Sequence, residues 1–299
     1  MPLHGLEADL ELAVLVIGSA IISYLIEGAI VSNYLFAGLL AGLFFLMGTH
    51  LEHFNPRKKE VLTGLASVYL TGLLIGGAFY LLGFGPVMIA LGLSAASIGS
   101  PSIWSNLSSA DGNLASEVSS AAVVSSILLI PSISLLLPIQ FNFTPIHVAI
   151  AYIPMVAGYL LKTSSFEYVQ EVRVHFSKLS LFLILLITGI QTQMLIESGA
   201  FISVISIVGK ASVFAVFFMT CFLASYPVSR LLGFNIKQSR AIAFSSSSKN
   251  VAIGFLLASM ISPEAVASVG IYYAVRQLMG VGTVDFFDEE ADIAQRLGL

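Results

Sequence analysis

Gly99-Ser-Pro-Ser-Ile-Trp-Ser-Asn106 interrupts one long apolar run of this sequence, and Ser245-Ser-Ser-Ser-Lys-Asn250 interrupts another. Asn106 and Asn250 lie about half of the 299-residue chain apart, so the interruptions occupy matching places in its two halves. A pair of hydrophobic segments broken by Gly, Pro or Ser in corresponding halves is typical of a secondary transporter built from inverted repeats. The two stretches therefore predict broken helices whose free backbone groups bind an ion or a substrate near the middle of a bilayer.

The composition is that of an integral membrane protein. Hydrophobic residues make up 57% of the chain and charged residues only 10%, whereas a soluble domain has about 25% charged residues. The mean hydropathy is +0.94. Cys221 is the one cysteine, so the chain forms no internal disulfide, and no Cys/His cluster suggests a metal site. We expect the lipid bilayer as a partner and no nucleic acid.

Ten apolar segments follow one another along the chain, each close to or above the ~20 residues that a membrane crossing needs. They run roughly over 10–27, 32–51, 60–82, 86–107, 113–137, 144–161, 177–197, 201–232, 238–260 and 264–287. The fourth and ninth contain the interruptions. The acidic start of the chain lacks a basic run, so we expect the first segment to be a permanent helix rather than a signal peptide.

The segments divide into two halves. The first portion, 1–161, contains a first repeat of five segments at about 10–137, and a second repeat of five follows at 144–287. The longest polar stretch, 162–178, is the expected cytoplasmic linker. The predicted fold is thus an all-α membrane protein of about ten transmembrane helices in two inverted five-helix repeats.

The basic residues predict the orientation. All but three of the 13 Lys and Arg residues follow an even-numbered segment, and the opposite loops contain none. The positive-inside rule then places both termini in the cytoplasm, as expected for a multi-pass protein of the cell membrane. The exceptions, Lys210, Lys249 and Arg276, fall within segments. Intramembrane charges usually line a water-filled path or pair with one another.

The first interruption permits two interpretations. Pro101 removes a backbone donor and frees carbonyl groups, and Ser105 and Asn106 add side-chain oxygens, the ligands that a hard cation such as sodium prefers. A proline-kinked helix with ordinary serine packing explains the same residues.

The second interruption is more informative because it contains Lys249. Small residues such as Ser245 and Ser248 fit a close helix crossing, but an ammonium about ten residues from either end of its segment needs a partner or releases its proton. Glu117 is a candidate partner. It is equally well explained as a carboxylate in the first turn of the fifth segment, near the cytoplasmic surface.

Arg276 and Lys210 also have two interpretations each. Arg276 binds an anionic substrate or satisfies backbone carbonyls of the ninth segment. Lys210 lies near the outer end of its segment, where its side chain reaches the interface.

The pattern resembles the bile acid:sodium symporter family over most of the chain. Leu43-Phe-Phe-Leu-Met-Gly-Thr-His-Leu51 resembles the family's apolar Met-Gly run. Pro101-Ser-Ile-Trp-Ser-Asn106, followed by Asp111-Gly-Asn-Leu-Ala-Ser116 and a Ser-rich segment, resembles its first crossover block, Gly-Gly-x-x-Ser-Asn and Gly-Asn/Asp-x-x-Leu-Ser. Arg240-Ala-Ile-Ala-Phe-Ser-Ser-Ser-Ser-Lys-Asn250 resembles the second block, Glu-x-Gly-x-Gln-Asn.

The resemblance implies a core domain of helices 3–5 and 8–10, in which the broken helices 4 and 9 cross. It also implies a panel domain of helices 1, 2, 6 and 7 that moves against the core in alternating access. In family members that bind two sodium ions, the Glu and Gln of the second block are ligands, and here Ser245 and Lys249 match them. We therefore hypothesise that the Lys249 ammonium replaces the second sodium. Ser105 and Asn106 match ligands of the first site, which leaves a residual sodium site there open.

Together these observations predict a secondary transporter of a small organic anion by alternating access, proton-coupled or sodium-independent, as a monomer or a homodimer. It has no phosphate-binding loop, H-E-x-x-H motif or nucleophile–base pair, so we expect neither an enzyme nor a cofactor other than sodium. The alternatives are a cation/proton antiporter on the related crossed-helix fold and a non-transporting membrane sensor. The candidate substrate- and ion-binding residues are Ser105, Asn106, Glu117, Ser119, Ser245, Ser248, Lys249, Asn250 and Arg276.

Overall fold

The computed structural model describes residues 33–56, 58–137, 139, 141, 143–163, 175–197 and 204–296, and every regular element in them is a helix. The helices are α2 (Asn33–His50), α3 (Lys59–Phe79), the π-helical η1 (Tyr80–Phe84), α4 (Val87–Leu93), α5 (Ser100–Leu107), α6 (Gly112–Ser134), α7 (Pro145–Thr163), α9 (Phe176–Glu197), α10 (Val204–Leu231), α11 (Ile236–Ser247), α12 (Val251–Ser259) and α13 (Pro263–Arg296). The predicted first segment, 10–27, and most of the linker 162–178 lie outside the described residues.

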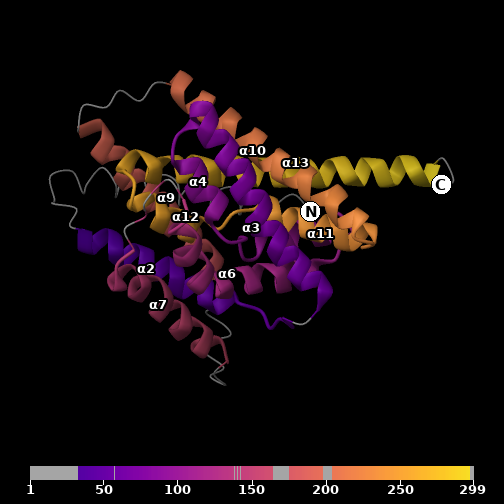
Figure 1. Ribbon diagram of the computed structural model, residues 1–299, viewed down its shortest axis with the longest axis horizontal. Helices are drawn as coiled ribbons and strands as arrows, with labels where there is room; N and C mark the ends of the chain where they lie inside the picture. The colour runs from indigo at the N-terminus through magenta and orange to yellow at the C-terminus, as the bar shows by residue number, and fades with distance from the viewer. Residues whose placement is uncertain are drawn as a thin grey trace, which may run out of the picture.

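Five of these helices are long and apolar enough to cross a membrane: Lys59–Phe84, Gly112–Ser134, Pro145–Thr163, Lys178–Ile196 and Ile205–Leu231. Leu35–His50 is a shorter apolar helix. This set is typical of a multi-pass helical membrane protein. The long helix α13 extends beyond the rest of the bundle (Figure 1).

Both predicted broken segments are broken, although the first break lies earlier than expected. The chain leaves helical geometry after Leu93 and resumes it at Ser100, so the break covers 94–99. Pro101 does not break the helix; it lies in the first turn of α5, where a missing amide donor costs nothing. Gly99 precedes α5 with φ +89°, a left-handed conformation that favours glycine. The second break, at 248–250, falls within the predicted stretch.

The two breaks cross each other. Ala96 and Lys249 form an isolated antiparallel bridge. The Ser97 amide donates to the Ser248 carbonyl at 2.6 Å, and the Asn250 amide donates to the Ala95 carbonyl at 2.7 Å. Backbone groups that the broken helices leave open are thereby paired inside the protein, which irregular backbone at membrane depth requires. The expected crossing of the broken helices is confirmed.

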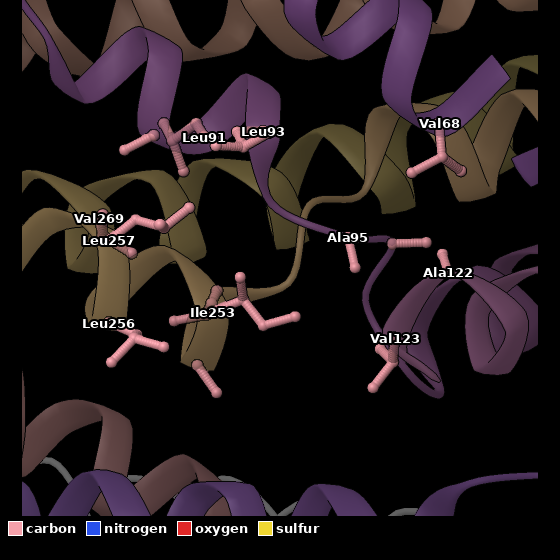
Figure 2. Close-up of a cluster of buried hydrophobic side chains, with 14 of the residues drawn as sticks. Val68, Leu91, Leu93, Ala95, Ala122, Val123, Ile253, Leu256, Leu257 and Val269 are labelled. Carbon is pink, nitrogen blue, oxygen red and sulfur yellow. The ribbon is translucent and has the colours of Figure 1, made fainter. Parts of the chain in front are cut away.

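Apolar side chains surround the crossing. Figure 2 shows Leu93 of α4 followed by Ala95 in the break, with Ile253 of α12 below them and Ala122 of α6 to one side. Each of these four side chains is buried. Helix α3 packs closely on α4, because a Cβ at Gly72 would lie 2.3 Å from the Gly92 carbonyl oxygen. The crossing is thus packed closely against its neighbouring helices.

Helices α2 and α7 pack closely on each other, and α9 contacts both α2 and α13. Helix α2 lies along α7 (Figure 1) and also contacts α9. The approach is close enough that a Cβ at Gly48 would lie 2.0 Å from the Met155 carbonyl oxygen, and a Cβ at Gly158 would lie 2.0 Å from that of Phe45. Small residues at such crossings are typical of membrane helix packing.

Ion pairs lie at both ends of the bundle. Lys58 pairs with Glu117 at 2.7 Å, and Lys162 pairs with Glu52 at 3.1 Å. The hydrogen bond with Glu117 raises the pKa of Lys58. At the other end of α10, Lys210 pairs with Glu264 at 2.7 Å. Lys58 and Lys162, from two of the basic loops expected on one side, thus lie at the same end of the molecule.

Candidate functional site

A cavity of about 260 Å³ lies beside the crossing. One wall is formed by side chains of α2 and α9, and the other by the two breaks and the helices that follow them. The lining residues are Leu43, Met47 and His50 of α2; Ser180, Leu181 and Ile184 of α9; and Ser97, Ile98, Gly99, Ser100, Ile103, Asn250, Val251, Ala252, Tyr273, Arg276 and Gln277.

Two helices begin at this cavity. Ser100 is the first residue of α5 and Val251 the first of α12, and both line the cavity. Asn250 caps α12, since its side chain accepts a hydrogen bond from the Ile253 amide at 3.1 Å. The N-terminal end of a helix presents unpaired amide groups and a partial positive charge. Both half-helices therefore favour an anion in the space between them.

Arg276 adds a full positive charge to the same cavity. Its side chain is 2% exposed, and its Nη1 donates to the Lys249 carbonyl at 2.8 Å. Nη2 lies 3.5 Å from the Ser100 hydroxyl, and the guanidinium lies 5.0 Å from the centre of the Tyr273 ring. Nε is buried without a hydrogen-bond partner. Within the described residues, no carboxylate is paired with Arg276.

The predicted role of Arg276 in satisfying carbonyls of the second interruption is thus confirmed by its bond to Lys249. Because that bond occupies one edge of the guanidinium, the buried Nε is left with an unused donor beside the cavity. A guanidinium with an unpaired donor and no counter-ion is suited to bind an acidic group.

Lys249 turns away from this cavity. Its side chain is fully buried, and Nζ donates to the Val68 carbonyl of α3 at 2.6 Å. Gly72, one turn later on α3, leaves room for the amine, because a Cβ there would lie 2.4 Å from Nζ. Lys249 does not line the cavity. Its ammonium joins the crossing to α3 and is not placed to contact a ligand between the walls.

Glu117 is not the partner of Lys249. It pairs instead with Lys58, and its side chain is 20% exposed. The reason is its position, since Glu117 lies only five residues into α6, at the charged end of the bundle. Of the two interpretations of this carboxylate, the one near the surface agrees with the structure.

The predicted serines are buried around the crossing. The hydroxyls of Ser105, Ser119 and Ser248 have no hydrogen-bond partner, while that of Ser245 donates to the Ala115 carbonyl at 3.4 Å. These serines belong to α5, α6 and the α11 side of the second break, which pack on one another.

Asn106 differs from its neighbour Ser105. Its side chain lies against Gly112, where a Cβ would meet its Oδ1 at 2.0 Å, and the residue is exposed. Adjacent helical residues point about 100° apart, so Ser105 and Asn106 do not face one site together through their side chains.

Several cavity residues were not predicted from the sequence. His50, Tyr273 and Gln277 belong to α2 and α13, outside the two interruptions. For Tyr273 the available signal was its spacing three residues before Arg276, which places both on one helix face. For His50 it was a polar ring at the end of an apolar segment.

Within the described residues, no group of three His, Cys, Asp or Glu side chains could hold a metal ion. Among known proteins, no family model matches the chain, and no curated protein is significantly similar to it.

Proposed function

We propose that this protein is a secondary transporter that moves a small organic anion by alternating access and does not use two-sodium coupling. The observation that carries the proposal is the convergence of Arg276 and the starts of α5 and α12 on one cavity. Three sources of positive potential without a paired carboxylate favour an anionic ligand. The apolar side chains of Leu43, Met47 and Ile184 on the facing wall suit the hydrocarbon part of such a ligand.

The position of the cavity supports alternating access. It lies between α2 and α9 on one side and the crossed breaks on the other. In the proposed mechanism, α2, α7 and α9, together with the segment at 10–27, form the panel, and the remaining helices form the core. Movement of one group past the other would expose the cavity to each side of the membrane in turn. The inverted repeat and the cytoplasmic position of both termini belong to the same proposal.

Lys249 supports independence from the second sodium ion. It brings a cation to the crossing, where related transporters would bind one, and the amine already occupies the carbonyl of Val68. A sodium ion at about 4 Å from an ammonium would be repelled by about 4 kcal/mol at an effective dielectric constant near 20. We infer that the lysine holds the crossing against α3 permanently, whereas a bound ion would hold it only transiently.

The proposal is tested by ligand-induced stabilisation of the purified protein in detergent. Organic carboxylates such as benzoate and glutarate should raise the melting temperature saturably and equally in sodium and potassium salts. R276Q should lose the effect by at least tenfold in apparent affinity. S180A changes the facing wall without altering charge and should retain it.

The other candidate functions give different results. A sodium-specific rise would show that an ion site survives at the crossing. Stabilisation by cations alone would favour an antiporter. Carboxylate binding without flux in liposomes would favour a sensor.

A further inference from the structure

Two further cavities adjoin each other at the end of α10 that carries Lys210, away from the proposed anion site. The first, of about 340 Å³, lies between α10 and the corner formed by η1 and α4. The second, of about 230 Å³, lies between α9, α10 and α13. Ser206, Lys210 and Ser268 line both cavities, so the two meet at these residues. No residue that lines either of them also lines the cavity beside the crossing.

The first cavity is apolar apart from the three shared residues. Its other lining residues are Phe84 of η1, Val87 and Met88 of α4, and Gly209, Val213 and Phe214 of α10. Met88 and Phe214 are buried, whereas Phe84 is exposed. A space with such walls in a membrane-spanning protein suits a hydrocarbon chain.

The second cavity is lined by hydroxyl groups whose hydrogens are already used. Thr188 donates to the Ile184 carbonyl, and Thr192 donates to the Thr188 carbonyl, each at 2.8 Å. Ser268 donates to the Glu264 carbonyl at 2.8 Å. A hydroxyl that has donated its hydrogen presents only lone pairs to a ligand, and the Glu264 carboxylate is a further acceptor. This cavity therefore favours a group that donates hydrogen bonds, and an ammonium donates three.

Lys210 and Glu264 are the charged side chains among the described residues that line these two cavities. Lys210 Nζ donates to the Glu264 carboxylate at 2.7 Å and to the Ser268 hydroxyl at 3.3 Å. A lysine ammonium has three hydrogens, so one donor of Lys210 remains for a ligand. The ion pair has no net charge. It offers one cation and one carboxylate to a ligand that itself carries both signs of charge.

Both charged residues lie near helix ends. Lys210 lies close to the start of the apolar span Ile205–Leu231, and Glu264 directly follows Pro263, the first residue of α13. Long charged side chains near the end of a membrane-spanning helix reach the interface, where lipid headgroups lie. A lipid can therefore meet this ion pair with its headgroup.

We propose that the two cavities bind one phospholipid whose headgroup carries a primary amine, such as phosphatidylethanolamine. In this lipid the phosphate lies between the amine and the acyl chains. The cavities have the same order, with hydrogen-bond acceptors at one end, Lys210 at the junction and apolar walls at the other end. The lipid ammonium donates to Glu264 and Thr192, a phosphate oxygen accepts from Lys210, and one acyl chain enters the apolar cavity. This inference is independent of the proposed transport function.

The chemistry of the site distinguishes this lipid from others. The four charges of lipid and protein alternate in sign, so each has an opposite charge beside it. Phosphatidylcholine carries the same charges, but its trimethylated nitrogen has no hydrogen to donate to the acceptors. Phosphatidylglycerol has no cation, and its negative charge meets Glu264 without compensation.

The test compares phosphatidylethanolamine, phosphatidylcholine and phosphatidylglycerol with identical oleoyl chains, added to the purified protein in mixed micelles. Apparent Kd is taken from thermal stabilisation. Phosphoethanolamine, the headgroup alone, is a fourth probe. For wild type we expect phosphatidylethanolamine to bind at least fivefold more tightly than the other two lipids, and phosphoethanolamine to have no effect at the same concentrations.

Two polar variants test the amine contacts. E264Q should lower the affinity for phosphatidylethanolamine at least fivefold, and T192V should lower it at least twofold, with little change for phosphatidylcholine. E117Q is the control for E264Q, because it removes an ion-paired carboxylate at the other end of the bundle. T220V is the control for T192V, because Thr220 also donates to its own helix but lines neither cavity. Both controls should keep the wild-type preference.

V213F tests the chain contact by filling the apolar cavity, and it should weaken all three lipids alike. V216F adds the same bulk at an exposed position outside both cavities and should change none of them. Each readout is a ratio of affinities, so a variant that melts below wild type still gives a result.

Equal affinity of wild type for phosphatidylethanolamine and phosphatidylcholine, or no stabilisation by any lipid, would overturn the proposal. So would a preference that E264Q and T192V leave intact, or one that E117Q and T220V abolish equally. If phosphoethanolamine alone binds as tightly as the lipid, or V213F binds the lipids as wild type does, no acyl chain occupies the apolar cavity and the lipid site is wrong.

Discussion

At the scale of single residues, the two internal cations have separate tasks. Arg276 lies at the cavity with an unpaired donor, whereas Lys249 extends from the crossing to the Val68 carbonyl of α3. Both are buried, and each contacts backbone at the crossing or beside it. Charged residues inside a membrane are costly. Here Lys249 holds the crossing to α3, and Arg276 faces the cavity.

Gly72 is expected to be indispensable for this arrangement. In G72A the new Cβ would lie 2.3 Å from the Gly92 carbonyl oxygen and 2.4 Å from Lys249 Nζ. We expect a loss of stability of about 1–3 kcal/mol, as for other overpacked cores, measured as a lower melting temperature in detergent. Gly77, on the same helix, has nothing within 4 Å of its Cβ position, so G77A should melt no lower than wild type. Equal melting temperatures for G72A and wild type would contradict the close packing of α3 on the crossing.

Replacing the lysine tests whether it takes the place of an ion. The double variant S245E/K249Q installs the two side chains that the resemblance assigns to sodium binding. We expect it to gain a sodium-specific rise in melting temperature over potassium, while wild type shows none. The single variant K249Q, without the carboxylate, should show little sodium effect. If the double variant folds but its melting temperature is the same in sodium and potassium, the idea that Lys249 substitutes for sodium is contradicted.

At the scale of elements, the start of α12 contributes both to the stability of the fold and to the wall of the cavity. Asn250 caps α12 through its Oδ1, and its Nδ2 lies 3.4 Å from the Ala96 carbonyl of the other break. An aspartate here would keep the cap but place a negative charge at the cavity.

N250D is therefore expected to weaken carboxylate binding by at least tenfold, and to lower the melting temperature because a carboxylate oxygen would replace the donor to the Ala96 carbonyl. N250A should lower stability by about 1 kcal/mol through loss of the cap. Asn235 caps α11 by an equivalent bond to the Gln238 amide, away from the cavity, so N235D adds the same charge without affecting binding. The measurement is apparent Kd for benzoate from thermal shifts. An N250D variant that binds as tightly as wild type would exclude the start of α12 from the anion site.

The existence of most helices and of the two breaks could be predicted from the sequence, because long apolar runs and short polar breaks are local signals. The predicted segments 113–137 and 144–161 correspond to α6 and α7 to within a few residues. The first break was misplaced because Pro101 was interpreted as a helix breaker, although it is tolerated in a first turn. His50 lines the cavity because α2 packs beside α9 and α12, and no local pattern reports such a contact.

At the scale of the whole molecule, α2 and α7 pack on each other, and α9 lies between α2 and α13. The cavity lies beside the crossing, between side chains of α2 and α9 and those of the two breaks. The ion pairs Lys58–Glu117 and Lys162–Glu52 lie at one end of the bundle, and Lys210–Glu264 lies at the other. In the proposed mechanism, α2, α7 and α9 move against the remaining helices.

Such movement predicts a particular set of distance changes. A spin label at Thr163 of α7 and another at Lys237 of α11, both exposed, should change their separation when benzoate is added. Labels at Ser109 and Lys237, both in the other group, should keep theirs. The buried Cys221 is first replaced by alanine. Equal distance distributions with and without benzoate for the first pair would contradict alternating access by these groups.

The most direct test of the central claim is uptake of radiolabelled benzoate and glutarate into proteoliposomes that contain potassium as the only metal cation. For wild type we predict saturable uptake of at least one of the two, and a loss of at least tenfold in R276Q. Uptake that requires sodium, or uptake that R276Q leaves unchanged, would contradict an anion site built on Arg276 and the starts of α5 and α12.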